Sequence, residues 1–252
     1  MGTILYFTGS GVSKPSGIPT FRGSGGLYEN ERLFRYVTID CRREESCRRE
    51  AFSRYIYRSA LISKAKPNAY HKLPIEARSI GFETFVVTQN VDDLHERLYD
   101  RVFHIHGEIR LWIGRERLYA REIPVRYLDN PIGSLVKRYA RLSQEELLEM
   151  LYDPEPLEGD LYKFYRPGVV LYGEPVEIIS IDADIAIIAG TSAQVYPAAM
   201  IPYLSRPKYT IVVSEEPIYR DLEPIYVRYR GREPEDVVEE VLEIIKDLKS
   251  EL

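Results

Sequence analysis

Short apolar runs recur along the chain, and helical or irregular stretches separate them. Several runs, such as IAIIA at 185–189, show no alternation of apolar and polar positions, which is typical of strands buried on both faces of a parallel sheet. Strands that alternate with helices indicate a doubly wound α/β sheet. The expected strands are Thr3–Phe7, Thr84–Thr88, Val102–Ile105, Val169–Leu171, Ile185–Ala189 and Tyr209–Val213.

The apolar positions predict amphipathic helices over residues 45–63, 69–79 and 236–249. In the last of these, the apolar residues form one stripe and Pro234 stands at the start, a position that proline favours. A capping-box pattern, Ser143-x-x-Glu146, precedes a further apolar run, and the Pro131–Gly133 stretch is typical of a turn.

Two regions interrupt the alternation of strands and helices. Residues 28–66 are charged and helical in character, and residues 108–165 carry short ambiguous runs. We predict that these two insertions together build a smaller module over one edge of a Rossmann-like doubly wound parallel sheet. The sheet domain would then comprise residues 1–27, 67–107 and 166–252.

The composition of the 252 residues is that of a globular protein, with 44% hydrophobic and 29% charged residues. The net charge of −5 does not favour direct binding of nucleic acid. The chain contains neither an apolar run of 18 residues nor a signal-peptide pattern, so we expect no membrane association and a cytoplasmic location. Cys41 and Cys47 are the only cysteines, and their spacing fits neither a metal knuckle nor a disulfide framework.

Small or polar residues follow several expected strands, and ligands of open α/β sheets bind beyond the carboxyl ends of strands. Gly9-Ser10-Gly11 follows the first strand, where backbone N–H groups can meet a ligand phosphate; a structural turn is an equally good interpretation. Thr88–His95 offers polar side chains for sugar hydroxyls, although Asn90 and Asp92 can also cap a helix. Gly190–Ala199 begins with another small, hydroxyl-rich turn.

Two histidines, His104 and His106, lie two residues apart near the end of an expected strand, so they point to one face. Metal ligation is possible, but no third histidine or cysteine lies nearby in the sequence. A histidine at a strand end suits a general base, because its pKa lies close to neutral pH. A buried structural histidine remains the alternative.

In their order and spacing, these motifs resemble those of the Sir2 (sirtuin) family of NAD-dependent protein deacylases. The family pattern G-A-G-I-S-x-x-S-G-I-P-x-F-R corresponds to residues 9–22, and T-Q-N-x-D-x-L-H corresponds to residues 88–95. Further matches are H-G at 106–107, P-N-x-x-H at 67–71, R-P-x-V-V-x-F-G-E at 166–174 with Tyr172 in place of Phe, and G-T-S-x-x-V-x-P-A-A at 190–199. The resemblance covers about residues 3 to 215.

The resemblance implies NAD as the cofactor, His106 as the catalytic general base and Asn90 as its catalytic partner at the nicotinamide ribose. It implies that Phe21 and Arg22 close over that ribose and that Phe21 shields it from water. The implied cofactor-binding residues are Gly9, Ser10, Gly11, Ser13, Thr20, Phe21, Arg22, Gln89, Asn90, Asp92, His106, Gly190, Thr191, Ser192 and Ser214. The other histidines, His71, His95 and His104, are expected to be structural or to lie behind the site.

The implied reaction removes acyl groups, acetyl above all, from protein lysines and yields nicotinamide and O-acyl-ADP-ribose. The acylated peptide would add as a strand between the two domains, with chromatin proteins among the implied partners. Alternatives are ADP-ribosyl transfer to protein, NAD hydrolysis, or an NAD-binding module without catalysis. The implied substrate-binding residues are Val170, Tyr172, Gly173, Glu174 and Val195.

The chain departs from the family pattern in its second insertion, where family members carry two C-x-x-C pairs. Residues 108–165 contain no cysteine and no histidine, so we expect no zinc. Apolar packing should stabilise this insertion instead. Further departures are Ser10, Thr20, Glu108 and Ser214, and the apolar candidates are Leu111, Trp112, Ile113, Leu118, Tyr119, Tyr127, Leu135, Tyr139, Leu147 and Leu151.

Overall fold

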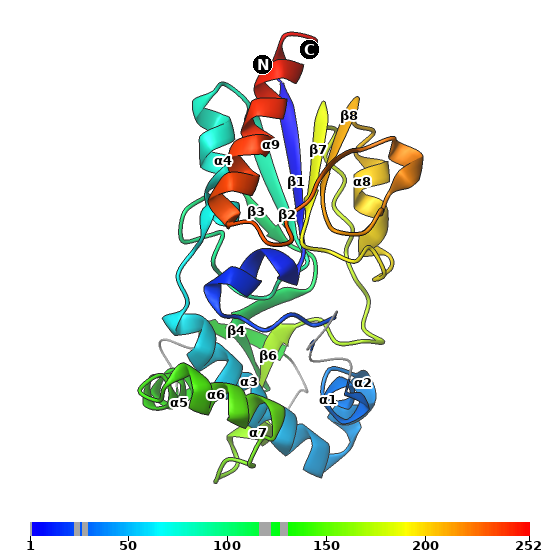
Figure 1. Ribbon diagram of the computed structural model, residues 1–252. Coiled ribbons are helices and arrows are strands. Elements are labelled where there is room, and N and C mark those ends of the chain that lie inside the picture. Colours follow the sequence, from blue (N-terminus) through cyan, green and yellow to red (C-terminus); the bar gives the residue numbers. More distant parts are fainter. Residues whose placement is uncertain (1, 23–25, 27–29, 116–121, 127–130) are drawn as a thin grey trace.

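Six parallel strands form the central sheet of the molecule, in the order β3-β2-β1-β7-β8-β9 (Figure 1). The computed structural model describes residues 2–22, 26, 30–115, 122–126 and 131–252. Strand order reverses between β1 and β7, which makes this the switch point of a doubly wound sheet. The strands are β1 (Thr3–Thr8), β2 (Glu83–Thr88), β3 (Val102–His104), β7 (Ile185–Ala189), β8 (Tyr209–Val213) and β9 (Ile225–Val227).

The apolar runs that show no alternation of apolar and polar residues form the central strands of this sheet. All five residues of β7 are buried, and Ile4 of β1 pairs with Ile185 of β7. The fold class is therefore as expected, an α/β doubly wound sheet. The predicted strand Val169–Leu171 was wrong as a member of this sheet, and β9 was not predicted.

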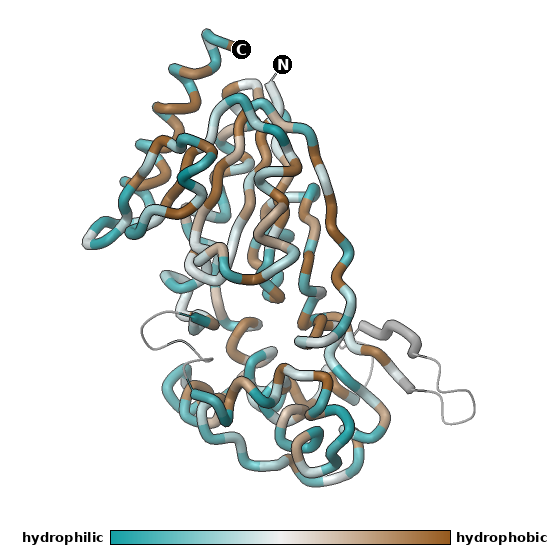
Figure 2. The backbone as a smooth tube through the Cα atoms, turned by 90° about the vertical axis from the view of Figure 1, so that its right-hand side faces the viewer, coloured by the Kyte–Doolittle hydropathy of each residue, from teal (hydrophilic) through white to brown (hydrophobic). Residues whose placement is uncertain are grey.

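Helices cover both faces of the sheet, as its buried central strands require (Figures 1 and 2). On one face, α4 (Ala69–Ser79) packs beside α9 (Pro234–Lys249) over a cluster that includes Ile187 and Ile211. On the other face, η4 (Ala198–Met200) and α8 (Ile201–Leu204) cover Leu5 and Ile188. Among the described residues, no helix has the length and apolarity needed to cross a membrane.

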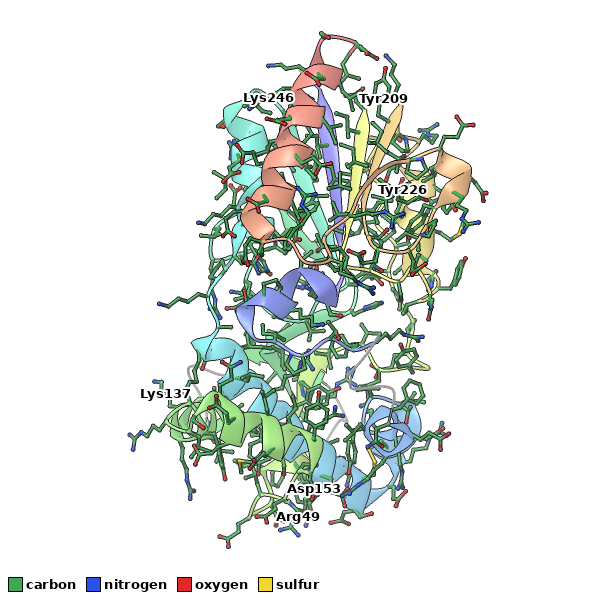
Figure 3. All side chains as sticks on the ribbon, viewed as in Figure 1. Arg49, Lys137, Asp153, Tyr209, Tyr226 and Lys246 are labelled. Atoms are coloured by element: carbon green, nitrogen blue, oxygen red, sulfur yellow. A yellow bond between two sulfur atoms is a disulfide. The ribbon has the colours of Figure 1, made fainter. Side chains whose placement is uncertain are left out.

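A second module lies beyond the carboxyl ends of the strands, below the sheet in Figure 1. It contains a three-stranded antiparallel sheet in the order β5-β4-β6. Figure 3 marks its far end with Arg49 and Asp153, and the opposite end of the molecule with Lys246. Its elements are α1 (Glu31–Arg35), α2 (Ile39–Arg43), α3 (Glu45–Lys64), β4 (Gly107–Arg115), β5 (Glu122–Arg126), α5 (Pro131–Tyr139), α6 (Gln144–Tyr152), α7 (Leu161–Phe164) and β6 (Tyr165–Val169).

Helix α3 is the axis of this module, and α5 and α6 pack against it. Trp112 of β4 is fully buried, with its ring 5.4 Å from the ring of Phe52 of α3 in an edge-on arrangement. The core therefore joins side chains from both insertions. Of the apolar candidates, Trp112, Leu147 and Leu151 are buried in it, Leu135 and Tyr139 pack at its edge, Leu111 and Ile113 are half-buried outside it, and Leu118, Tyr119 and Tyr127 lie outside the described residues.

Local signals in the second insertion had mixed outcomes. The capping box of α6 is present: the Glu146 N–H donates to Ser143 Oγ at 3.1 Å, and the Ser143 N–H donates to Glu146 Oε2 at 2.7 Å. The predicted Pro131–Gly133 turn was wrong, because Pro131 is the first residue of α5. Proline is compatible with both roles, since its fixed φ suits a first helical position as well as a turn.

The two cysteines form a disulfide, so the expectation that their spacing fits no disulfide was wrong. Cys41 of α2 and Cys47 of α3 have their Cα atoms 5.2 Å apart. The chain changes direction between these two helices, and the change brings positions six residues apart face to face. Sequence spacing alone does not reveal such a corner.

Candidate active site

A cleft of about 1190 Å³ lies between the sheet and the second module, beyond the carboxyl ends of the strands. Residues that follow β1, β2, β7 and β8 form its sheet side. Residues of α3 and of the segment 169–176 form its opposite side. This position at the switch point is where open α/β sheets bind ligands, and the volume exceeds that of a typical drug-sized pocket.

The first glycine loop packs directly on the turn that follows β7. The Gly9 N–H donates to the Ala189 carbonyl at 3.0 Å, and the Gly11 N–H donates to the Gly190 carbonyl at 2.9 Å. A Cβ added at Gly9 would lie 2.5 Å from the Gly190 oxygen. These two N–H groups are thus already bonded, which corrects the expectation that they face a ligand phosphate. The glycines allow two backbones to meet beside the cleft.

Asn90 is held at three of its four polar groups. Its N–H donates to Thr88 Oγ1 at 3.0 Å, its Nδ2 donates to Ser13 Oγ at 3.1 Å, and its carbonyl lies 2.7 Å from His104 Nδ1. The fourth group, Oδ1, is buried and has no hydrogen-bond partner among the described residues. Asn90 lines the cleft, and a buried polar atom without a partner calls for one, which makes Oδ1 a candidate contact for a ligand hydroxyl.

Ser13 forms the centre of a hydrogen-bond network behind Asn90. Its hydroxyl donates to Asp92 Oδ2 at 3.0 Å and lies 3.4 Å from His71 Nε2. The Asn68 N–H donates to His71 Nδ1, so the proton of the neutral ring is on Nε2 and points at Ser13. Burial lowers the pKa of His71 to about 4, which keeps the ring neutral.

Ser13 and Asp92 were expected to contact the cofactor, but the structure buries both side chains inside the protein. The Ser13 side chain is completely buried and its hydrogen-bonding capacity is used within the network. Asp92 is also buried, and its other carboxylate oxygen accepts the Leu94 N–H. The alternative that Asp92 caps a following helix was wrong, because residues 91–100 form turns and no helix. Burial raises the pKa of Asp92, and the bonds from Leu94 and Ser13 oppose that rise. We therefore assign both residues to positioning Asn90.

His106 lies in the tight turn between β3 and β4 and lines the cleft. Its Nδ1 lies 3.2 Å from the Gln89 carbonyl, which can only accept, so Nδ1 carries the proton and Nε2 carries the lone pair. Burial lowers the pKa of His106, and the bond to Gln89 offsets part of that effect. Gly107 has φ of +74° and a Cβ there would lie 2.1 Å from the Gly168 oxygen, so only glycine allows this turn.

Polar contacts link the remaining cofactor-side candidates around the cleft. Gln89 Nε2 donates to Thr191 Oγ1 at 2.9 Å, and the Phe21 N–H donates to Ser10 Oγ at 3.3 Å. Arg22 reaches Gln194 Oε1 at 3.0 Å and the Tyr172 hydroxyl at 3.3 Å. Thr20, Gly190, Ser192 and Ser214 also line the cleft.

The expected substrate segment forms the opposite rim, and Val170, Tyr172, Gly173, Glu174 and Val195 all line the cleft. Tyr172 is bonded along one edge to the second module: its N–H donates to the Val37 carbonyl at 2.8 Å, and its carbonyl accepts the Ile39 N–H at 2.9 Å. The Glu174 carboxylate accepts from Arg42 at 2.6 Å and from Arg166 at 2.7 Å. This carboxylate therefore holds the rim together.

Sequence reasoning missed two parts of the cleft. Arg54, Tyr55 and Arg58 of α3 line it. The only signal in the sequence was two arginines four residues apart on a helix that was expected to be amphipathic. Residues 229–234 also line it, and they follow the unpredicted strand β9.

The donor set of the second insertion does not fit a structural zinc ion. Its residues 108–165 include neither cysteine nor histidine, and carboxylates alone are poor ligands for such a site. The donor set of the cleft does fit a dinucleotide. The unpartnered Asn90 Oδ1 and the His106 lone pair offer acceptors for sugar hydroxyls in a cavity of sufficient size.

Comparison of the sequence with known proteins finds one family and many relatives. The family model described as the Sir2 family matches residues 9–197. An NAD-dependent protein deacylase of Thermococcus kodakarensis is 34% identical over 265 residues, which cover 98% of this chain and 92% of that protein. One of Pyrococcus abyssi is 33% identical over 249 residues, which cover 91% of this chain and 88% of that protein.

Solved structures with the same arrangement include two complexes. A Sir2 homolog in complex with NAD has a TM-score of 0.67 and 28% identity, over 98% of this chain and 90% of that one. A Sir2 protein with a deacetylated p53 peptide and 3′-O-acetyl ADP ribose has a TM-score of 0.65 and 25% identity, over 97% of this chain and 93% of that one.

Proposed function

The chain belongs to the Sir2 family, and from this premise we propose that it removes acyl groups from protein lysines at the expense of NAD. The products would be nicotinamide, O-acyl-ADP-ribose and the free lysine. The observation that carries the proposal is the pairing of His106 and Asn90 on one cleft, each with an acceptor atom for which the described residues provide no partner.

In this proposal, His106 is the general base. The Gln89 carbonyl fixes its tautomer, and burial keeps the ring neutral at neutral pH, so Nε2 can accept a proton from a ribose hydroxyl. Asn90 orients the same sugar through Oδ1, because its other three polar groups are bonded to the protein. NAD, when bound, supplies the anomeric carbon that takes up the acyl oxygen as nicotinamide leaves.

The other cleft residues would orient the reactants and exclude water. Phe21 lies with its ring 4.2 Å from the Arg58 guanidinium carbon, between the sheet side and α3. Arg22 bridges Gln194 and Tyr172 across the cleft rim. The rim segment 170–174 and Val195 would receive the acylated peptide. A chromatin protein as the target remains a proposal that only the family suggests.

The wall contributed by α3 favours a second class of acyl group. Arg54 and Arg58 are 6% and 4% exposed and line the cleft on either side of Tyr55. Arg54 donates to two backbone carbonyls. Arg58, which stacks on Phe21 and also acts on the charge of Asp92, adds a second buried guanidinium to this wall, and buried guanidinium groups favour anionic partners. An acyl group that ends in a carboxylate, such as succinyl, therefore suits this wall. Arg58→Met should lower kcat/KM for a succinyl-lysine peptide more than for an acetyl-lysine peptide.

The experiment that tests the proposed function measures nicotinamide release from NAD, with and without acetyl- and succinyl-lysine peptides. We expect release that depends on a peptide, a deacylated product, and a loss of about 100-fold or more in His106→Ala. Release without peptide, with ADP-ribose free or on protein, would instead support NAD hydrolysis or ADP-ribosyl transfer. NAD binding without release would leave a non-catalytic module.

A further inference from the structure

Two histidines from one short stretch of chain hold consecutive carbonyls of the catalytic loop. His104 Nδ1 lies 2.7 Å from the Asn90 carbonyl, and His106 Nδ1 lies 3.2 Å from the Gln89 carbonyl. His104 is the last residue of β3, and His106 lies in the turn that follows it. The proposed function uses only one of the two rings, so the role of the other needs an explanation.

The contacts of His104 require both of its ring nitrogens to carry protons. Its Nδ1 faces the Asn90 carbonyl oxygen, and its Nε2 is hydrogen-bonded to Glu96 Oε1. Both partners can only accept when the carboxylate is ionised, so His104 must donate at both ends and is an imidazolium. Its side chain is 5% exposed, and therefore water does not replace either partner.

The charges around His104 agree with this state. Burial alone would lower the pKa of His104, but the hydrogen bond and charge of Glu96, the Asn90 carbonyl and Glu108 together raise it. Arg110 balances these carboxylates: its Nε donates to Glu108 Oε2 at 2.9 Å, and its Nη2 lies 4.0 Å from Glu96 Oε1. Asp92 and His95 are the other titratable groups that interact electrostatically with His104.

The same cluster could hold a metal ion by geometry alone, since ligand atoms of Glu96, His104 and Glu108 lie within 4.8 Å of one another. Arg110, however, already provides a positive charge to both carboxylates. The contact between Nε2 and Glu96 is also accounted for by a proton. The cluster therefore acts on Asn90, through the ring that touches its carbonyl.

We propose that His104 is a positioning residue for the nicotinamide-release step, in which its imidazolium, held by Glu96, fixes the backbone of Asn90. The inference rests on the proposed function. The hydrogen bond from His104 to the Asn90 carbonyl is the third contact between Asn90 and the protein. After these three contacts, Oδ1 is the one polar atom of Asn90 that remains for a ligand. A neutral His104 would place the Nε2 lone pair against the Glu96 carboxylate, and the repulsion would displace the ring and the loop it holds.

The two histidines should then titrate with opposite effects on the rate. The pKa of His106 is lowered, so protonation of this base gives an acid limb below pH 6.5. The pKa of His104 is raised, so loss of its proton gives an alkaline limb above pH 6.5. The pH profile of kcat should therefore be bell-shaped, with one limb belonging to each ring.

The test compares wild type with His104→Asn, His104→Leu and Glu96→Gln in the peptide-dependent release of nicotinamide. The asparagine amide lies where Nδ1 does and cannot titrate, so His104→Asn should keep kcat within about 3-fold at pH 7 and lose the alkaline limb. In Glu96→Gln the amide can donate to the Nε2 of a neutral His104, so this variant should lose the alkaline limb and leave the acid limb in place. His104→Leu should lower kcat by about 10- to 100-fold, because the loop loses its anchor.

A second readout does not depend on activity. Long-range ¹H–¹⁵N NMR of the four imidazoles, assigned by difference with His104→Asn, should show His104 protonated on both nitrogens at pH 7. A neutral His104 at pH 7, or an unchanged alkaline limb in His104→Asn, would overturn the inference. A doubly protonated His104 in an enzyme that releases no nicotinamide would contradict the proposed function and leave the state of His104 established.

Discussion

At the scale of single residues, the site depends on how few polar atoms are left unsatisfied around Asn90. We expected Ser13 and Asp92 to contact the cofactor and His71 to be structural. Instead, all three side chains form one hydrogen-bond network behind the cleft. The sequence identified these residues but did not show whether each one faces the cleft or lies behind it. That difference depends on burial, and burial depends on packing against segments far away in the sequence.

Removal of the Ser13 hydroxyl should affect both stability and catalysis. In Ser13→Ala, the buried Nδ2 of Asn90 and the carboxylate of Asp92 each lose a partner, which should cost about 1–3 kcal/mol of unfolding free energy. The Asn90 amide is then free to turn, so kcat should also fall. Denaturant unfolding and nicotinamide release measure the two effects. Ser79→Ala, whose hydroxyl donates within its own helix, is the matched control; equal behaviour of the two variants would contradict the assignment.

The buried histidines should make the fold sensitive to mild acid. Burial lowers the pKa of His71 to about 4, below the value near 6.5 of an unfolded chain. Between these values the unfolded state binds the extra proton, so this contribution to stability is present above pH 6.5 and is lost as pH falls toward 4. The unfolding free energy should therefore fall between pH 6.5 and pH 5. His71→Gln, which cannot titrate, should show a shallower fall; an identical slope would refute this origin.

At the scale of elements, the pattern of apolar residues predicted most strands of the parallel sheet. It failed at residues 169–171, where the chain pairs with a strand of the second module instead. Five of six expected strands lie in the parallel sheet, because continuous apolar runs suit strands covered on both faces. The run at 169–171 contributes only Val169 to a strand, and that strand pairs antiparallel with β4. Its partner begins one residue after His106, and nothing in the local sequence indicates this pairing.

The disulfide links the element beside the substrate rim to the axis of the second module. Cys41 lies on α2, which follows the segment 37–39 that bonds to Tyr172, and Cys47 lies on α3. The loop-entropy relation for so short a loop gives a stabilisation of about 2 kcal/mol. The double variant Cys41→Ser, Cys47→Ser should lose this amount in denaturant unfolding. Dithiothreitol should lower the midpoint of wild type and leave the double variant unchanged; if both shift equally, the bond contributes nothing.

At the scale of the whole molecule, two insertions share one core, and the cleft lies between that core and the sheet. The order of the motifs along the chain was sufficient to predict the sheet class and the sheet side of the cleft, because strand ends converge at one edge. It was not sufficient to predict the α3 wall. Arg54 and Arg58 resemble surface residues in the sequence, and only the packing of α3 beneath the cleft buries them.

The second module should be stable without zinc. Its core joins α3, α5 and α6 around Trp112. Residues 108–165 contain no cysteine or histidine, and the two cysteines of the module, Cys41 and Cys47, are joined in a disulfide. Metal analysis of protein purified without added metal should find far less than one zinc per chain, and EDTA should leave the unfolding midpoint unchanged. One tightly bound zinc per chain, with a midpoint that falls on chelation, would refute this prediction.

The central claim is that His106 and Asn90 act on one sugar of bound NAD, and a crystal structure of the His106→Asn variant with NAD tests it most directly. We predict that a hydroxyl of the nicotinamide ribose lies within about 2.6–3.2 Å of Asn90 Oδ1 and on the side of the cleft where residue 106 points. A dinucleotide bound with that ribose elsewhere, or a cleft closed by packed side chains between these two residues, would contradict the account.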